Sequence, residues 1–155
     1  MIDCIKKEIF LKSSLYKNCK ISTIYFGGGT PSILTIEDLE SIFNSIYENF
    51  EVEKDIEITL EANPDDFVLE KFINLRKLGV NRLSIGIQSF DDNVLKFINR
   101  AHDKVCAENS IKIAKEAGFE NLSLDIIFAM VNSSFDILKK DLEKMIDFSP
   151  SHISC

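Results

Sequence analysis

Four short segments of the chain alternate between apolar and polar residues, a pattern that predicts β-strands with two unlike faces. These segments lie at residues 22–26, 56–61, 82–88 and 122–128, and a fifth strand is expected to start at His152. One face of each strand is aliphatic and suits burial against helices, and the other is polar or small. In segment 82–88 the two faces are Leu83, Ile85 and Ile87, and Ser84, Gly86 and Gln88.

Between these strands, apolar residues recur at helical spacing. Residues 36–50 give the clearest pattern, because Thr35 stands at the N-cap position and Asp38, three residues later, resembles a capping box. A second helix is expected to bury Val68, Phe72, Leu75 and Leu78 and to end at Gly79. Asp91 and Asp103 are candidate N-caps of further helices, and Gly118 is expected to end a later helix. A last helix is expected to end before Pro150. Its apolar residues are Phe135, Leu138, Leu142, Met145 and Ile146.

Strands and helices alternate at about 30 residues per unit, which predicts a parallel sheet with crossover helices, either doubly wound or curved toward a barrel. Strands of a doubly wound sheet are apolar on both faces, whereas these strands alternate. The alternation favours a curved sheet around a polar lumen that holds ligand or water. A flat sheet with one solvated face is the alternative, although that arrangement is typical of antiparallel sheets. Because a full eight-stranded barrel needs about 250 residues, residues 1–155 are expected to form one partial barrel domain.

Composition and charge narrow the choice of partners. The formal net charge is −7 and no basic cluster is present, which favours a small-molecule ligand over nucleic acid or an anionic membrane. No apolar run approaches the roughly 20 residues of a membrane span, and residues 1–16 lack the features of a signal peptide, so a cytoplasmic location is expected. The four cysteines are scattered, which indicates reduced thiols and no metal site.

Three consecutive glycines, Gly27, Gly28 and Gly29, follow the first predicted strand and precede a helix. Glycines in this position let backbone N–H groups approach a polar ligand. No Gly-Lys-Ser/Thr follows, which excludes a phosphate-binding P-loop, and Ser32 stands where the dinucleotide fingerprint has its third glycine. The alternative is that the glycines serve only a turn.

Polar side chains stand at or near the carboxyl ends of the other predicted strands, where parallel α/β folds bind ligands. They are Glu61, Asn63, Gln88 and Asp125. Glu61 and Asp125 suit a paired acid and base, hard-metal ligands together with Asn63, or carboxylates that bind ribose hydroxyls or an ammonium group. Arg100 and His102, taken alone, are interpreted as surface residues.

The combination of these motifs resembles the radical S-adenosylmethionine proteins of the oxygen-independent coproporphyrinogen III oxidase group, and especially the HemW-type haem chaperones. The resemblance covers nearly the whole chain. The matching segments are Tyr25-Phe26-Gly27-Gly28-Gly29-Thr30-Pro31-Ser32, Glu61-Ala62-Asn63-Pro64, residues 79–90, Arg100-Ala101-His102 and Asn121-Leu122-Ser123-Leu124-Asp125. Gln88-Ser89-Phe90 and Arg100-Ala101-His102 are more similar to the chaperone branch than to the oxidase branch.

The resemblance implies a partial (β/α)6 barrel of the TIM-like kind, with S-adenosylmethionine bound across the strand ends. By position, Gly28, Gly29 and Thr30 match the loop that meets the methionine moiety, and Glu61 matches a cofactor-binding glutamate. Positions that contact a second S-adenosylmethionine in the oxidase branch are matched by Gln88, Arg100 and Asp125. The implied role is radical chemistry, or the binding and delivery of haem.

The chain also departs from the family. It has no Cys-x-x-x-Cys-x-x-Cys motif, whose thiolates hold the family's 4Fe–4S cluster, so it is expected not to cleave S-adenosylmethionine reductively on its own. The resemblance starts just after that motif and stops at the sixth strand, so a chain truncated at both ends is expected. The segment 129–134 replaces a Gly-Leu-Pro-Gly-Gln-Thr-like turn, so an altered loop is expected beside Asp125.

Three hypotheses follow from the sequence. The first is a truncated radical S-adenosylmethionine protein linked to haem or porphyrin metabolism. The second is a non-redox module that binds S-adenosylmethionine or another nucleoside. The third is a non-functional remnant, since an incomplete barrel exposes unpaired strand edges and is prone to associate.

Overall fold

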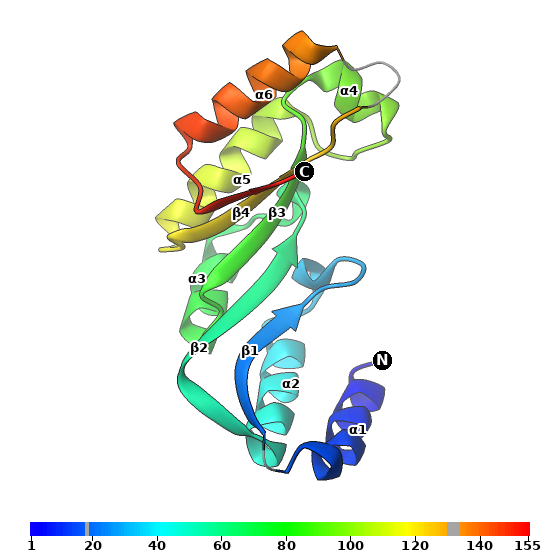
Figure 1. Cartoon of the computed structure of the whole chain (residues 1–155), viewed down its shortest axis with the longest axis vertical. Coiled ribbons are helices and arrows are strands. Elements are labelled where there is room, and N and C mark those ends of the chain that lie inside the picture. Colours follow the sequence, from blue (N-terminus) through cyan, green and yellow to red (C-terminus); the bar gives the residue numbers. More distant parts are fainter. Residues whose placement is uncertain (18, 130–133) are drawn as a thin grey trace.

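The computed structural model describes residues 1–17, 19–129 and 134–155 of the chain. Five parallel strands form one sheet in the order β1-β2-β3-β4-β5 (Figure 1). The order along the sheet follows the order along the chain, whereas in a doubly wound sheet the order reverses at a switch point. The structure therefore confirms the predicted parallel sheet and its winding in one direction.

The elements agree with the predicted ones to within a few residues at most ends. The strands are β1 (Lys20–Phe26), β2 (Glu51–Ala62), β3 (Arg82–Gln88), β4 (Asn121–Ile126) and β5 (His152–Ser154). The helices are α1 (Ile2–Ser13), α2 (Ile36–Asn49), α3 (Leu69–Leu78), α4 (Asp92–Phe97), α5 (Lys104–Glu116) and α6 (Phe135–Asp147), with short 3-10 turns η1 (Ser14–Tyr16), η2 (Pro31–Ile33) and η3 (Pro64–Asp66).

Local hydrogen bonds explain where the helices begin. The Thr35 hydroxyl accepts from the Asp38 amide at 3.1 Å, which confirms the predicted N-cap of α2. Asp91 and Asp103 cap α4 and α5 in the same way. Two expectations about burial are wrong. Val68 is 61% exposed, because it stands at the N-cap of α3, outside the buried stripe of that helix. His102, expected at the surface, is only 5% exposed, and its Nε2 lies 3.1 Å from the Ile87 carbonyl.

Helix ends depend on backbone conformation as well as on caps. Gly79 ends α3 with φ of 110°, a left-handed conformation that glycine adopts without steric cost.

The fourth strand is shorter than predicted, since β4 ends at Ile126 and Phe128 is exposed. Ala129 follows with φ of 60°, in the left-handed region that favours glycine. The rest of the expected altered loop, residues 130–133, lies outside the described residues.

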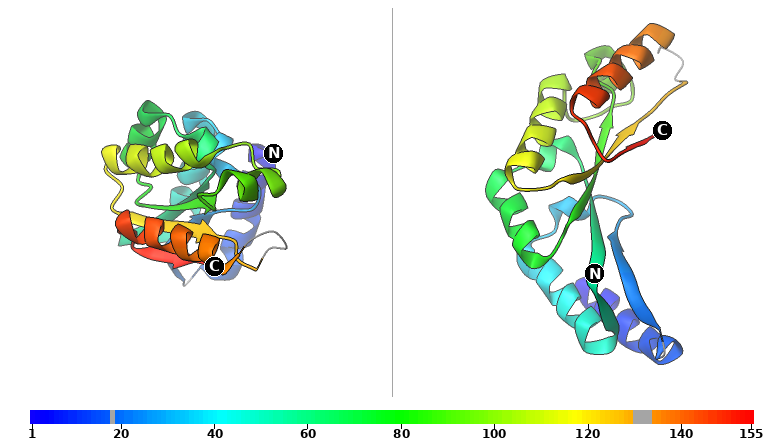
Figure 2. Two further views of the ribbon diagram at one scale, coloured as in Figure 1. Left: turned by 90° about the horizontal axis from the view of Figure 1, so that it is seen from above. Right: turned by 60° about the vertical axis from the view of Figure 1, so that its left-hand side comes forward.

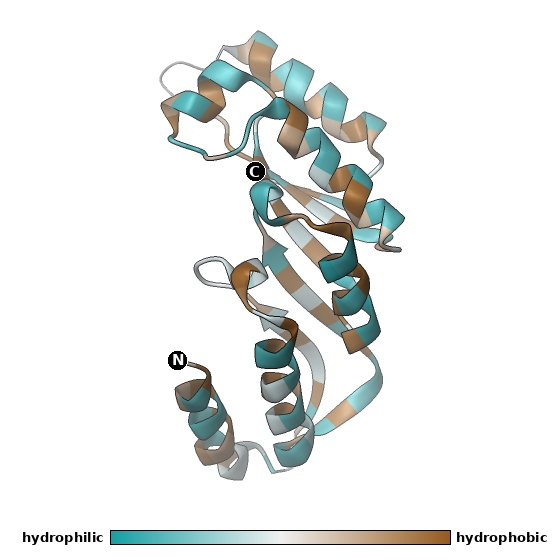
Figure 3. Cartoon of the chain, turned by 180° about the vertical axis from the view of Figure 1, so that it is seen from behind, coloured by the Kyte–Doolittle hydropathy of each residue, from teal (hydrophilic) through white to brown (hydrophobic). Residues whose placement is uncertain are grey.

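The aliphatic faces of the strands form the core together with the helices along one side of the sheet (Figure 2). Brown and pale segments alternate along the strands in Figure 3, as the sequence pattern predicts. Phe72 of α3 is fully buried and stacks on Phe67 with ring centroids 3.9 Å apart. The fully buried aliphatic residues of the central strands and the helices beneath them include Leu60, Leu83, Ile85, Leu124, Leu75 and Ile111.

The other face of the sheet is polar, as predicted, but its side chains find partners within the protein. The Arg82 guanidinium donates to the Thr59 hydroxyl at 3.2 Å, and the Ser123 hydroxyl lies 3.0 Å from Nδ1 of His152. In the described part of the chain, no buried side-chain nitrogen or oxygen lacks a hydrogen-bond partner. The fully buried polar groups of this face therefore need no ligand as a hydrogen-bond partner.

No helix among the described residues has both the length and the apolar character that crossing a bilayer requires. The first helix, α1, buries none of its residues.

Candidate functional site

The three glycines after β1 are required for two different reasons. Gly28 and Gly29 have φ of 80° and 85°, in the left-handed region that favours glycine. A Cβ on either would meet no atom within 4 Å, so this backbone is open on that side. A Cβ on Gly27 would lie 2.6 Å from Cε1 of Tyr25 and 2.9 Å from Oε1 of Glu61. Gly27 therefore makes room for these two side chains.

The Glu61 carboxylate is held at the carboxyl end of β2 by two donors from the neighbouring strand and loop. The Tyr25 hydroxyl donates to Oε1 at 2.8 Å, and the Gly28 amide donates to Oε2 at 3.2 Å. Burial raises the pKa of Tyr25, and the hydrogen bond and charge of Glu61 raise it further, so the phenol stays protonated as a donor. Each carboxylate oxygen keeps a free lone pair for a ligand.

At the carboxyl end of β3, Gly86 makes room for three polar side chains. A Cβ there would lie 2.9 Å from Nε2 of Gln88, 3.2 Å from Nη2 of Arg100 and 3.6 Å from Oδ1 of Asn63. Pairing of β3 with β4 is irregular between Ile85 and Gln88. Irregular pairing of this kind redirects side chains and is common beside active sites.

Asp125 lies near the carboxyl end of β4 and is half-buried. The Ser84 hydroxyl lies 3.2 Å from Oδ1 and 3.3 Å from Oδ2 of this carboxylate. Burial raises the pKa of Asp125 and the Glu61 charge raises it further, while the Ser84 hydrogen bond opposes both effects. The site thus keeps two carboxylates near one another, an arrangement that favours a ligand with several hydrogen-bond donors.

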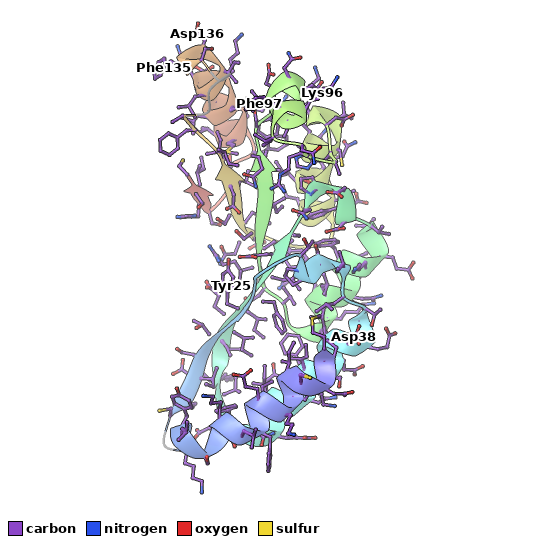
Figure 4. All side chains as sticks on the ribbon, turned by 90° about the vertical axis from the view of Figure 1, so that its right-hand side faces the viewer. Tyr25, Asp38, Lys96, Phe97, Phe135 and Asp136 are labelled. Carbon is purple, nitrogen blue, oxygen red and sulfur yellow. The ribbon has the colours of Figure 1, made fainter. Side chains whose placement is uncertain are left out.

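These side chains line one polar cavity of about 250 Å³. Tyr25, whose hydroxyl binds the lining residue Glu61, lies midway along the molecule, and the exposed Phe97 and Phe135 lie at one end (Figure 4). Its lining includes six of the seven predicted site residues, and the seventh, Gly28, binds Glu61 through its amide. The lining residues are Gly29, Thr30, Glu61, Ala62, Asn63, Ser84, Gly86, Gln88, Arg100 and Asp125.

Replacing Asp125 with asparagine is expected to stabilise the protein at neutral pH. A raised pKa means that the folded state favours the protonated carboxyl, so the stability from this group is present below its unfolded pKa of about 3.9 and is lost as pH rises through the folded pKa. Because the group is partly solvated, we expect Asp125→Asn to raise the thermal midpoint by only about 2 °C at pH 7. Thermal denaturation should show no gain near pH 4, and an equal gain at both pH values would contradict the stated cause.

A second, larger cavity of about 520 Å³ lies between α1, β1 and α2. Its lining is mostly aliphatic, including Ile5, Ile9 and Ile42, and contains no acidic or basic side chain. The smaller cavity is the better candidate for a polar ligand, because specific polar recognition needs convergent polar groups.

Two residues that support the site, Asp141 and Ser89, were not predicted as site residues. Asp141 of α6 is buried and accepts from the Ser89 hydroxyl at 2.6 Å and from the Phe90 amide at 2.8 Å. A signal was present: Asp141 is three residues after Leu138 and four before Met145, on the apolar stripe of its helix. Ser89 lay within a matching motif, but its partner is 52 residues away and could not be inferred.

The fold and the site define the class of protein. Residues 7–145 match the family model of the radical SAM superfamily, and the chain belongs to that superfamily. It is 39% identical over 153 residues to the haem chaperone HemW of Lactococcus lactis, covering 99% of this chain and 40% of the relative. It is 33% identical over 155 residues to the oxygen-independent coproporphyrinogen III oxidase of Helicobacter pylori, covering 99% and 34%.

Among solved structures, the coproporphyrinogen III oxidase HemN of Escherichia coli superposes with a TM-score of 0.86. The identity is 28%, and the match covers 98% of this chain and 36% of HemN. The match confirms the predicted radical SAM barrel fold. The chain spans 34 to 40% of the length of these three relatives.

The cofactors of the superfamily are S-adenosylmethionine and a 4Fe–4S cluster. The polar cavity fits the first, since it offers carboxylates, amides and a guanidinium beside an open glycine backbone. The second needs clustered thiolates. Cys4, Cys19 and Cys155 are exposed, and burial raises the pKa of Cys106. Within the described ranges, no three His, Cys, Asp or Glu side chains come together to hold a metal ion, so the residues present do not fit the cluster.

Proposed function

We propose that this chain binds S-adenosylmethionine at the polar cavity and acts in haem or porphyrin metabolism as a HemW-like or coproporphyrinogen oxidase-like protein of the cytoplasm. The observation that carries the proposal is the meeting of Glu61, Gln88, Arg100 and Asp125 in one cavity beside the glycine loop. The haem-related part is supported by similarity to relatives named haem chaperone and coproporphyrinogen III oxidase.

We assign the glycine loop and Glu61 to the same end of the cofactor. The backbone of Gly28 and Gly29 and the hydroxyl of Thr30 would meet the methionine moiety. The Glu61 carboxylate would accept from donors of the cofactor, its ammonium group or its ribose hydroxyls. These groups suit the role because Tyr25 and the Gly28 amide already fix the carboxylate. A fixed acceptor loses less conformational freedom when the ligand binds.

The remaining polar groups would contact the rest of the cofactor or a second ligand beside it. Gln88 and Arg100 supply donors, and Asp125 supplies an acceptor. A volume of about 250 Å³ is below the roughly 300 to 1,000 Å³ of typical small-molecule sites, so the cofactor would extend from the cavity over the glycine loop. S-adenosylmethionine supplies radical chemistry when a cluster reduces it, and these residues would bind and orient it.

A second candidate function is a non-redox module that binds S-adenosylmethionine or a related nucleoside. The observation that favours it is the scatter of the cysteines, of which three are exposed and far apart in the sequence. This candidate needs the same cavity and the same residues, so the two functions differ in what else the chain binds.

Isothermal titration calorimetry with S-adenosylmethionine in iron-free buffer tests the shared part of both candidates. We expect binding in the micromolar range, because the cavity lining supplies hydrogen-bond donors and acceptors without iron. A folded chain that gives no heat with millimolar ligand would contradict both candidates and favour a non-functional remnant. A soluble monomer with cooperative unfolding would count against the remnant.

A haem titration, followed by absorbance and repeated with a porphyrin, separates the two candidates. Binding of either compound to the chain loaded with S-adenosylmethionine would favour the haem-related role. Binding of S-adenosylmethionine with no response to haem or porphyrin would favour the non-redox module.

A further inference from the structure

The backbone at Gln88 adopts a strained conformation. Its φ is 68°, in a region that residues with side chains rarely occupy. The Ser89 amide donates to the Ile87 carbonyl at 2.9 Å, which closes a γ-turn with Gln88 at its centre. Such a turn persists only where the surrounding structure holds it. The contacts around the turn therefore show what keeps the Gln88 side chain in the cavity.

The two oxygens of Asp141 accept hydrogen bonds from the two residues that follow Gln88. The Ser89 hydroxyl donates to Oδ2 at 2.6 Å, and the Phe90 amide donates to Oδ1 at 2.8 Å. The Ser89 oxygen in turn accepts from the Asp91 amide at 3.0 Å. The Ser89 side chain is fully buried and Asp141 is 5% exposed, so these bonds do not compete with water. One side chain of α6 thus binds two consecutive residues next to the site, and the Ser89 hydroxyl binds the amide of the third.

A third contact holds Ile87, the residue before Gln88. Nε2 of His102 lies 3.1 Å from the Ile87 carbonyl, and since a carbonyl only accepts, this nitrogen carries the proton. The turn is therefore fixed on both sides of Gln88, from the loop before α5 and from α6. Burying a carboxylate is costly, and burial raises the pKa of Asp141. An apolar residue on the same helix stripe would fill the space without that cost.

We propose that Asp141 is a positioning residue of the polar cavity: it fixes the turn at Gln88 and so keeps the Gln88 amide beside Arg100, where a ligand can meet both. The inference rests on the proposed function for its ligand, S-adenosylmethionine. Asp141 itself is not among the residues that line the cavity. It acts through Gln88.

Binding measured in two backgrounds tests the proposal. In the wild-type background we expect Asp141→Asn to raise the Kd for S-adenosylmethionine about fivefold, because one of the two donors loses its acceptor and the turn relaxes. In the Gln88→Gly background the amide and the strain are both absent, so the same change should move the Kd by less than about twofold. Asp147→Asn, an exposed change of equal charge on the same helix, is the matched control.

Amide exchange followed by NMR gives a readout that needs no ligand. The Ser89 amide binds the Ile87 carbonyl, and the Ile127 amide binds the Gln88 carbonyl at 3.0 Å. We expect both to exchange about tenfold faster in Asp141→Asn, while the Ile58 amide, bound to Asn81 at 2.8 Å, stays unchanged. If Asp141→Asn does not fold, Ser89→Ala is measured instead, since it removes the two hydrogen bonds of the Ser89 hydroxyl and keeps the bond from the Phe90 amide to Asp141.

Unchanged exchange at Ser89 and Ile127 would overturn the inference whatever the binding result. Equal losses of affinity in both backgrounds would also overturn it, because they would show a general structural role. A wild-type chain that does not bind S-adenosylmethionine would overturn the proposed function, and the exchange rates would still support or overturn the link between Asp141 and the turn.

Discussion

Replacing Glu61 with glutamine is expected to weaken the binding of S-adenosylmethionine by about 10- to 100-fold, since a hydrogen bond to a charged group contributes about 1.5 to 3 kcal/mol. The carboxylate is fixed at the rim of the polar cavity by Tyr25 and the Gly28 amide. Glutamine has the same shape but lacks the charge and offers one acceptor oxygen. We expect the thermal midpoint to stay within about 2 °C, because Glu61 is not part of the apolar core. Calorimetry and thermal denaturation measure the two quantities.

Glu57 provides the matched control for this experiment. It lies on β2 and on the same face of the sheet as Glu61, but toward the amino end of the strand, and it is exposed. Its carboxylate lies 3.4 Å from Nδ2 of Asn121, away from the cavity lining. Glu57→Gln should leave the affinity unchanged. Equal losses in the two variants would point to a general effect of charge and would remove Glu61 from the site.

Gly86→Ala is expected to reduce the affinity about tenfold while the protein stays folded. The new methyl group would lie 2.9 Å from Nε2 of Gln88 and 3.2 Å from Nη2 of Arg100, so the Gln88 amide must leave its place in the cavity and the Arg100 guanidinium must shift slightly. Both atoms are the ends of flexible side chains, and Gly86 is not among the glycines with positive φ, so the backbone should accept alanine. Displacing two donors accounts for a loss of about 1.4 kcal/mol, or tenfold.

Gly79→Ala is the contrasting control, because it should lower the stability of the protein and leave the affinity unchanged. Gly79 has φ of 110°, and a Cβ there would meet Ile58 at an ordinary 3.6 Å. Alanine at this φ is strained by about 1 to 2 kcal/mol, so the thermal midpoint should fall while the affinity holds. If Gly86→Ala loses stability and Gly79→Ala loses affinity, the assignment of these two glycines is wrong.

Much of the fold could be predicted because its signals are local. The alternation along β3 indicates which face joins the apolar core, and Thr35, Asp91 and Asp103 accept from amide donors within their own first turns. Errors occurred where a local pattern meets a boundary. Val68 fits the spacing of α3, but as the N-cap residue it precedes the first helical residue, and its side chain is exposed.

The residues that line the candidate site could be predicted, but the contacts that hold them in place could not. Glu61, Gln88 and Asp125 follow neighbouring parallel strands, and such strand ends meet at one edge of a sheet, so their proximity follows from topology. The γ-turn at Gln88 could not be predicted, because glutamine disfavours positive φ and only tertiary contacts impose it. The same holds for the Tyr25 bond to Glu61, which joins residues 36 positions apart.

By itself, the sequence determined the succession of strands and helices, their buried faces, the helix caps and the residues gathered at the strand ends. These depend on periods of two or about four residues and on side chains that bond to nearby backbone. Tertiary structure alone decided which buried polar groups pair with one another, that the Glu61 carboxylate is held by Tyr25, and that Asp141 fixes the turn at Gln88. Those features join groups far apart in the chain, and their free energies depend on burial that exists only once the sheet and helices have packed.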